Sequence, residues 1–167
     1  MASTVTRRQL LRADPSGRRR PVRPPWATPR FHADCTRCDA CLPACREGIL
    51  VRGDGGFPEI DFRRGECTFC GDCVIACSPK ALQRSEPSAS PWHHVAHVAP
   101  ACLEAHGVHC RACADPCPEE VVRFRPGTLN TPPEIDVSGC TGCGACVAPC
   151  PVRAVHIGPP TSQEVAA

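Results

Sequence analysis

The chain has 167 residues, 16 of which are cysteine, but only five phenylalanines, two tryptophans and no tyrosine. So few aromatic side chains cannot fill the core of an ordinary enzyme of this length, and 20 prolines with 13 glycines favour short elements joined by turns. The net charge of +2 at pH 7 conceals an uneven distribution. The length allows one domain or two small ones. The composition therefore excludes an ordinary enzyme and predicts a fold that something other than side-chain packing holds together.

The first 30 residues form a basic segment, with eight arginines and one aspartate, whereas the remainder has 11 basic and 16 acidic side chains. This composition predicts a flexible tail that contacts a protein partner or the acidic remainder. It argues against nucleic-acid binding, because no aromatic residues are interleaved with the arginines. Residues 6–11 (TRRQLL) resemble the start of a twin-arginine export signal, but no apolar run follows them. No transmembrane segment is expected either, so we expect a soluble, cytoplasmic protein.

In a reducing cytoplasm, clustered cysteines bind metal rather than form disulfides. Twelve of the cysteines form three copies of one pattern, C-x2-C-x2-C-x3-C. The copies are Cys35, Cys38, Cys41 and Cys45; Cys67, Cys70, Cys73 and Cys77; and Cys140, Cys143, Cys146 and Cys150. A fourth group keeps the end of this pattern but has seven residues between its first two cysteines. That group is Cys102, Cys110, Cys113 and Cys117.

This spacing is that of bacterial ferredoxins, in which three thiolates of a tight loop hold one [4Fe-4S] cluster and the fourth ligates a neighbouring cluster. The same exchange here predicts four ligand sets, which we call sites 1 to 4. Site 1 is Cys35, Cys38, Cys41 and Cys77, and site 2 is Cys45, Cys67, Cys70 and Cys73. Site 3 is Cys102, Cys110, Cys113 and Cys150, and site 4 is Cys117, Cys140, Cys143 and Cys146. We predict four clusters. The minimum expected is three, because the spacing of the Cys102 group departs from the pattern.

Zinc is the alternative metal, since it takes four cysteines from two C-x2-C pairs separated by a longer loop. A zinc ribbon would leave the middle cysteine of each regular group without a role. Glycines inside the cysteine loops support the cluster interpretation, because Gly71, Gly142 and Gly144 can adopt positive φ and turn backbone N–H groups toward sulfur. They are equally compatible with simple turns.

A repeat at an offset of 75 residues, PEID at 58–61 and at 133–136, indicates two homologous halves. Short apolar segments after each group predict strands, and the residues after the third cysteines predict helical turns. The expected fold is therefore α+β, a tandem pair of bacterial-ferredoxin-like dicluster modules with short β-hairpins and short helices. The expected divisions are a basic tail (1–30), a first module (31–82), a linker (83–101), a second module (102–158) and a C-terminal tail (159–167).

Three histidines lie at the end of the expected linker. His93 and His97 would share one face of a helix, which is the geometry of a zinc site. No further ligand stands at matching spacing, so a solvated helix start with Trp92 and Val95 packing inward is the preferred interpretation.

The chain resembles the NapF-type ferredoxins, the accessory iron-sulfur proteins of periplasmic nitrate reductase systems. The matching segments are residues 6–11, 23–27 (RPPWA), 53–59 (GDGGFPE), 66–71 (ECTFCG) and 140–146 (CTGCGAC). The resemblance implies a cytoplasmic protein that contacts the precursor of the molybdenum-containing catalytic subunit and helps it mature before export. Two positions depart from the usual pattern, because Arg46 and Ser78 stand where proline commonly follows the fourth cysteine.

No catalytic constellation is evident, so we expect an electron carrier or maturation factor rather than an enzyme. Two alternatives stay open. The chain could be a chaperone-like binding module whose clusters only support the fold, or an electron-transfer subunit of a larger membrane-associated oxidoreductase.

Overall fold

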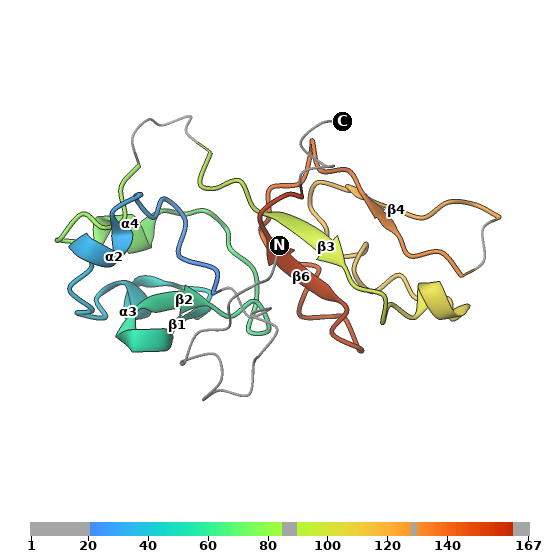
Figure 1. Ribbon diagram of the computed structural model, residues 1–167, viewed down its shortest axis with the longest axis horizontal. Helices are drawn as coiled ribbons and strands as arrows, with labels where there is room; N and C mark the ends of the chain where they lie inside the picture. Colours follow the sequence, from blue (N-terminus) through green and yellow to red (C-terminus); the bar gives the residue numbers. More distant parts are fainter. Residues whose placement is uncertain (1–20, 85–89, 128–129, 162–167) are drawn as a thin grey trace, which may run out of the picture.

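The computed structural model describes residues 21–84, 90–127 and 130–161 (Figure 1). Most of the expected basic tail, the middle of the expected linker and the end of the expected C-terminal tail lie outside the described residues. In Figure 1 the N-terminal half, coloured blue to green, and the C-terminal half, coloured yellow to red, lie side by side along the longest axis.

An antiparallel hairpin lies in each half. In the N-terminal half, β1 (Leu50–Arg52) pairs with β2 (Pro58–Ile60) across the short helical turn η1 (Asp54–Gly56). In the C-terminal half, β4 (Val122–Arg123) pairs with β5 (Glu134–Ile135). These hairpins confirm the strands predicted from the apolar segments that follow Cys45 and Cys117.

Short helices lie next to the cysteine loops. In the N-terminal half, α2 (Phe31–Asp34) leads into the first loop, and α3 (Cys41–Ala44) and α4 (Asp72–Ile75) each carry a third cysteine. In the C-terminal half, η2 (Glu104–His106) occupies the seven-residue gap before Cys110.

A second strand pair closes each half. β3 (Val95–Val98) pairs antiparallel with β6 (Val155–Gly158) in the C-terminal half. The N-terminal half has the reduced equivalent, an antiparallel bridge between Ala27 and Leu82. In each half, the first extended segment therefore pairs with the last one, and the hairpin lies between them in the sequence. The tandem pair of α+β modules is confirmed.

The structure differs from two of the expected divisions. Residues 21–30, expected as tail, pack on the first module, since Trp26 is buried and the Ile60 N–H donates a hydrogen bond to the Val22 carbonyl at 2.8 Å. Residues 95–98, expected as linker, form β3. In both places the segment supplies backbone partners that the rest of its module needs.

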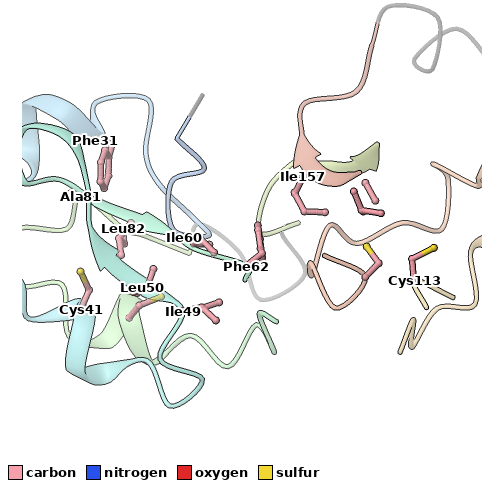
Figure 2. Packing of buried hydrophobic residues seen from close by; sticks show 14 residues of the cluster. Phe31, Cys41, Ile49, Leu50, Ile60, Phe62, Ala81, Leu82, Cys113 and Ile157 are labelled. Carbon is pink, nitrogen blue, oxygen red and sulfur yellow. The ribbon is translucent and has the colours of Figure 1, made fainter. Parts of the chain in front are cut away.

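The core is formed partly by cysteine. The third cysteine of every group is buried among aliphatic and aromatic side chains, and these four are Cys41, Cys73, Cys113 and Cys146. Figure 2 shows that most of the labelled core residues lie in the N-terminal half, with Phe62 directed toward the C-terminal half. Among the described residues no polar or charged side chain is buried. The sulfur-bearing loops thus replace the large side chains that the composition lacks.

Candidate iron-sulfur centres

Three cysteine loops share one backbone conformation. They are loop I (residues 35–41), loop II (67–73) and loop IV (140–146). In each, the residue before the second cysteine and the residue after it have positive φ. The pairs are Arg37 (60°) and Asp39 (62°), Phe69 (53°) and Gly71 (85°), and Gly142 (70°) and Gly144 (84°). The positive φ predicted for the three glycines is confirmed.

The sequence reasoning missed Arg37, Asp39 and Phe69 at these positions. A non-glycine residue at positive φ costs on the order of 1 kcal/mol and is retained where the surrounding structure requires it. The main available signal was the position within the C-x2-C-x2-C pattern, because arginine and phenylalanine do not favour this conformation, although aspartate is enriched in it.

A second repeated feature follows the fourth cysteine of every group. The residue three positions after this cysteine has positive φ, and its backbone N–H donates a hydrogen bond to the carbonyl of the cysteine. The four donors are Gly48 (3.0 Å), Lys80 (3.0 Å), Glu120 (3.2 Å) and Arg153 (3.2 Å). The turn therefore forms after Arg46 and Ser78 as it does after Pro118 and Pro151. Loss of proline leaves the bend unchanged.

Three cavities show which cysteines come together. One of about 20 Å³ is lined by Cys35, Cys38, Cys41 and Cys77. One of about 30 Å³ is lined by Cys45, Cys67, Cys70 and Cys73, and one of about 20 Å³ by Cys117, Cys140, Cys143 and Cys146. Each cavity exceeds the space that one water needs. The structure thus brings together the residues of sites 1, 2 and 4, with the fourth cysteine of each drawn from the neighbouring group.

The residues of site 3 also approach one another. Burial chiefly, and the nearby Cys102, Cys110 and Cys150 to a smaller extent, raise the pKa of Cys113 to about 11. The long gap before Cys110 is folded into η2, whose Glu104 accepts a hydrogen bond from the Cys110 N–H at 2.9 Å. Cys102 is therefore near Cys113 despite its irregular spacing.

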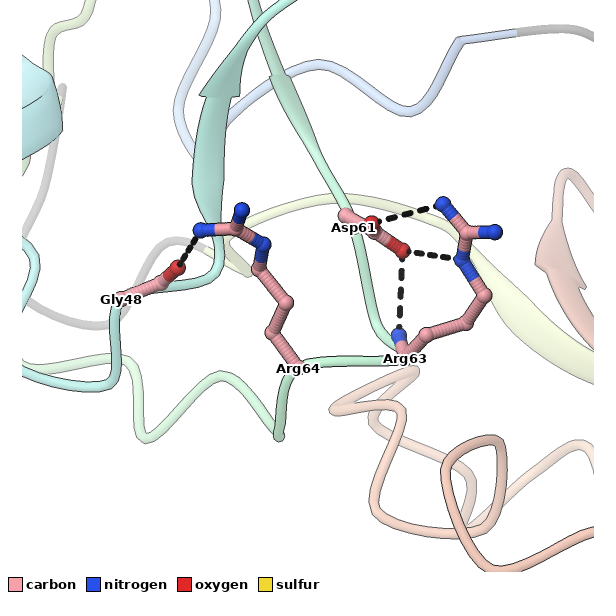
Figure 3. Close-up of polar contacts among 4 residues, drawn as sticks. All are labelled: Gly48, Asp61, Arg63 and Arg64. Atoms are coloured by element: carbon pink, nitrogen blue, oxygen red, sulfur yellow. Dashed lines mark hydrogen bonds and ion pairs between the residues drawn. The ribbon is translucent and has the colours of Figure 1, made fainter.

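A local ion pair and one longer-range hydrogen bond lie beside the two segments that supply site 2 (Figure 3). Arg63 donates to both carboxylate oxygens of Asp61, from Nε at 2.7 Å and from Nη2 at 2.8 Å. Its neighbour Arg64 donates from Nη1 to the Gly48 carbonyl at 3.4 Å. The turn after Cys45 is in this way tied to the segment that leads into Cys67.

Burial disfavours thiolates in the metal-free chain. The pKa of Cys67, Cys73 and Cys146 is raised to about 12. Burial is the largest cause, and neighbouring thiols contribute to the same increase. Ligation to iron requires thiolates, so iron must supply the charge that compensates them.

Backbone N–H groups already point at three of the sulfurs. They belong to Leu82 (3.4 Å from Cys77 Sγ), Ala96 (3.4 Å from Cys140 Sγ) and Ala154 (3.2 Å from Cys150 Sγ). Such hydrogen bonds stabilise charge on sulfur and influence the potential of a cluster.

The donor sets fit a cluster better than a single ion. Within residues 21–84, 90–127 and 130–161, no three His, Cys, Asp or Glu side chains form a group that would hold one metal ion. Tetrahedral zinc needs four sulfurs about 2.3 Å from one point. Four thiols that surround a cavity instead match the corners of a cube of iron and sulfide.

The helical arrangement of His93 and His97 is wrong, because residues 95–98 form a strand. His97 instead lies opposite His156 in the β3–β6 register, with the ring centroids 5.3 Å apart and the planes inclined by 27°. Pairing with β6 outweighs any local preference for a helix.

Comparison with known proteins agrees with this geometry. A model for the 4Fe-4S dicluster domain matches residues 34–81 and 108–154. The ferredoxin-type protein NapF of Escherichia coli K12 is 40% identical over 125 residues, which is 72% of this chain and 74% of that protein. The chain belongs to the NapF-type ferredoxins.

Other relatives extend this comparison. NapF of Haemophilus influenzae is 44% identical over 106 residues, 62% of this chain and 59% of that protein. The methylamine utilization ferredoxin-type protein MauM of Paracoccus denitrificans is 31% identical over 142 residues, 74% of this chain and 63% of that protein. This NapF-type ferredoxin is accordingly a ferredoxin-type iron-sulfur protein with two dicluster domains, the second of which is matched without Cys102.

In the part of the chain that the structure describes, none of the helices has the length and hydropathy needed to cross a bilayer.

Proposed function

We propose that this chain binds four [4Fe-4S] clusters, one at each of sites 1 to 4, and carries single electrons. The observation that supports this most strongly is that three cavities are each lined by four cysteines from two separate groups. A bound cluster supplies a one-electron couple. The residues of the chain hold it, limit its contact with water and orient N–H dipoles toward its sulfur ligands.

Access to the clusters is uneven. Of the sixteen cysteines, all in the described part of the chain, only Cys38 and Cys70 are exposed. They belong to sites 1 and 2, so the N-terminal half is the side at which an external redox partner approaches most closely.

In the cell, we propose, the protein acts in the cytoplasm on the precursor of the molybdenum-containing catalytic subunit of periplasmic nitrate reductase, before its export. Membership of the NapF-type ferredoxins supports this assignment. The protein either delivers electrons to the precursor or assists its maturation through direct contact.

Redox titration and capture of the precursor test the two parts of the proposal. Midpoint potentials between about −700 and +450 mV support electron transfer, whereas clusters that can be reduced only below about −700 mV contradict it. Tagged holoprotein is expected to retain the precursor from anaerobic extract. Equal retention by iron-depleted chain would favour the chaperone-like alternative, and no retention by either form would contradict the partner.

A further inference from the structure

The two modules touch through their cysteine loops. The Cys67 N–H, at the start of loop II, donates a hydrogen bond to the Cys143 carbonyl in loop IV at 2.8 Å. Loop II supplies three cysteines of site 2 and loop IV three of site 4. One backbone hydrogen bond therefore links a residue of site 2 to a residue of site 4.

Aromatic side chains surround this contact. Trp92 Nε1 donates to the Thr141 carbonyl of loop IV at 2.9 Å, and its ring lies edge-on to Phe69 of loop II, with centroids 5.5 Å apart. The ring of Phe62 lies 6.2 Å from that of Trp92. We call this contact between loops II and IV, with its three aromatic rings, the junction.

Glycine at position 144 allows the modules to approach this closely, and Gly142 allows a similar approach within the C-terminal half. A Cβ on Gly144 would overlap the ring of Phe62, and one on Gly142 would overlap the His94 carbonyl oxygen. Positive φ alone does not require glycine here, because Arg37 and Asp39 adopt it at the equivalent positions of loop I. Loop IV has glycine at the two positions where neighbouring atoms leave no room for a Cβ.

The neighbouring sites in each module are also adjacent. Helix α3, which carries Cys41 of site 1, packs against α4, which carries Cys73 of site 2, and Cys146 of site 4 lies in the same buried cluster as Cys113 of site 3. Together with the junction, these contacts connect all four sites in one linear order.

From this arrangement we infer that the two modules form a single electron relay in the order site 1, site 2, site 4, site 3, with the junction as its middle step. The inference rests on the proposed binding of four clusters. Passing one electron from site 2 to site 4 oxidises the first cluster and reduces the second, with no bond broken and no proton transferred. Two independent dicluster carriers joined by a linker would lack this step.

The experiment compares the anaerobically loaded full chain with Gly144→Ala and Gly127→Ala. Both substitutions add one methyl group to a glycine with positive φ, 84° at Gly144 and 75° at Gly127. Gly127 lies outside the cysteine loops, and a Cβ there would meet no atom within 4 Å. Each protein is fully reduced and its electron paramagnetic resonance spectrum recorded, together with its iron content.

The relay predicts spin–spin broadening between the modules in the unmodified chain and in Gly127→Ala, and its loss in Gly144→Ala at equal iron content. An unchanged spectrum in loaded Gly144→Ala overturns the relay. The relay is also overturned if the spectrum of the unmodified chain is fully described by two pairs of clusters, each interacting only within its own module.

Two further outcomes are distinguishable from these. If Gly144→Ala loses iron, the double variant Phe62→Ala with Gly144→Ala makes room for the methyl group, and the relay requires that broadening return. An unmodified chain with far fewer than about sixteen irons contradicts the proposed cluster binding itself rather than the relay.

Discussion

The Cys110 N–H donates a hydrogen bond to Glu104 Oε2 at 2.9 Å, and this contact closes the seven-residue segment that separates Cys102 from the rest of its group. Glu104 is largely buried, with a side chain 16% exposed. The irregular spacing is therefore taken up by a folded insertion that holds Cys110 beside η2.

Replacing Glu104 by alanine should loosen site 3 selectively. The lost hydrogen bond leaves the Cys110 N–H without its acceptor, at a cost of about 1 kcal/mol or more. We expect about four irons per chain to be released to a chelator faster than the remainder. Asp115→Ala, an exposed carboxylate in the same module, is the matched control. Uniform acceleration in both variants would contradict the role of Glu104.

Substitution of the fourth cysteines tests the exchange between groups. Cys77→Ala should alter the same reduced-cluster signal as Cys38→Ala, because both residues line one cavity. It should spare the signal altered by Cys70→Ala, which lines another. Electron paramagnetic resonance of the three variants distinguishes these cases. Cys70 and Cys77 belong to the same sequence group. If their substitution altered the same signal, each group would hold its own cluster and the exchange would be contradicted.

Two truncations test where the first module begins. Removing residues 1–20 should leave cluster retention on heating unchanged. Removing residues 1–30 also deletes Trp26, which is 8% exposed and has the Arg84 guanidinium 4.2 Å from its ring centroid. Loss of such a buried aromatic costs about 3–5 kcal/mol, so the loss of iron should occur at clearly lower temperature. Equal behaviour of the two truncations would place the boundary at residue 31.

The stacked histidines predict a pH dependence. Burial lowers the pKa of His156, and the neighbouring His97 lowers it further. The folded chain therefore binds a proton less readily than the unfolded chain, so stability is retained above about pH 6.5 and lost as the pH falls below it. The temperature of cluster loss should fall between pH 7.5 and 5.5, and His156→Gln should reduce that fall. An identical fall in His156→Gln would assign the pH dependence to other groups.

Much of the candidate site follows from the sequence because the spacing of cysteines is itself a geometric constraint. A loop with two-residue gaps presents three thiols to one volume, and the exchanged partner follows from the repeat of the groups. The hairpins were predictable for a similar reason, since apolar segments and turn residues alternate after Cys45 and Cys117.

Other features depend on contacts that no local pattern contains. β3 is a strand because β6, almost 60 residues later, supplies its partner, whereas His93 and His97 by themselves suggest a helix. Arg37 and Phe69 adopt positive φ because of their loop positions and despite their residue types. The junction depends on Phe62, whose approach to Gly144 becomes visible only when the two modules are folded together.

Quantitation of iron and acid-labile sulfide in anaerobically purified full chain tests the central claim most directly. Four clusters predict about sixteen irons and about sixteen sulfides per chain. About twelve of each would remove the site that contains Cys102. Zinc without sulfide would contradict the account as a whole.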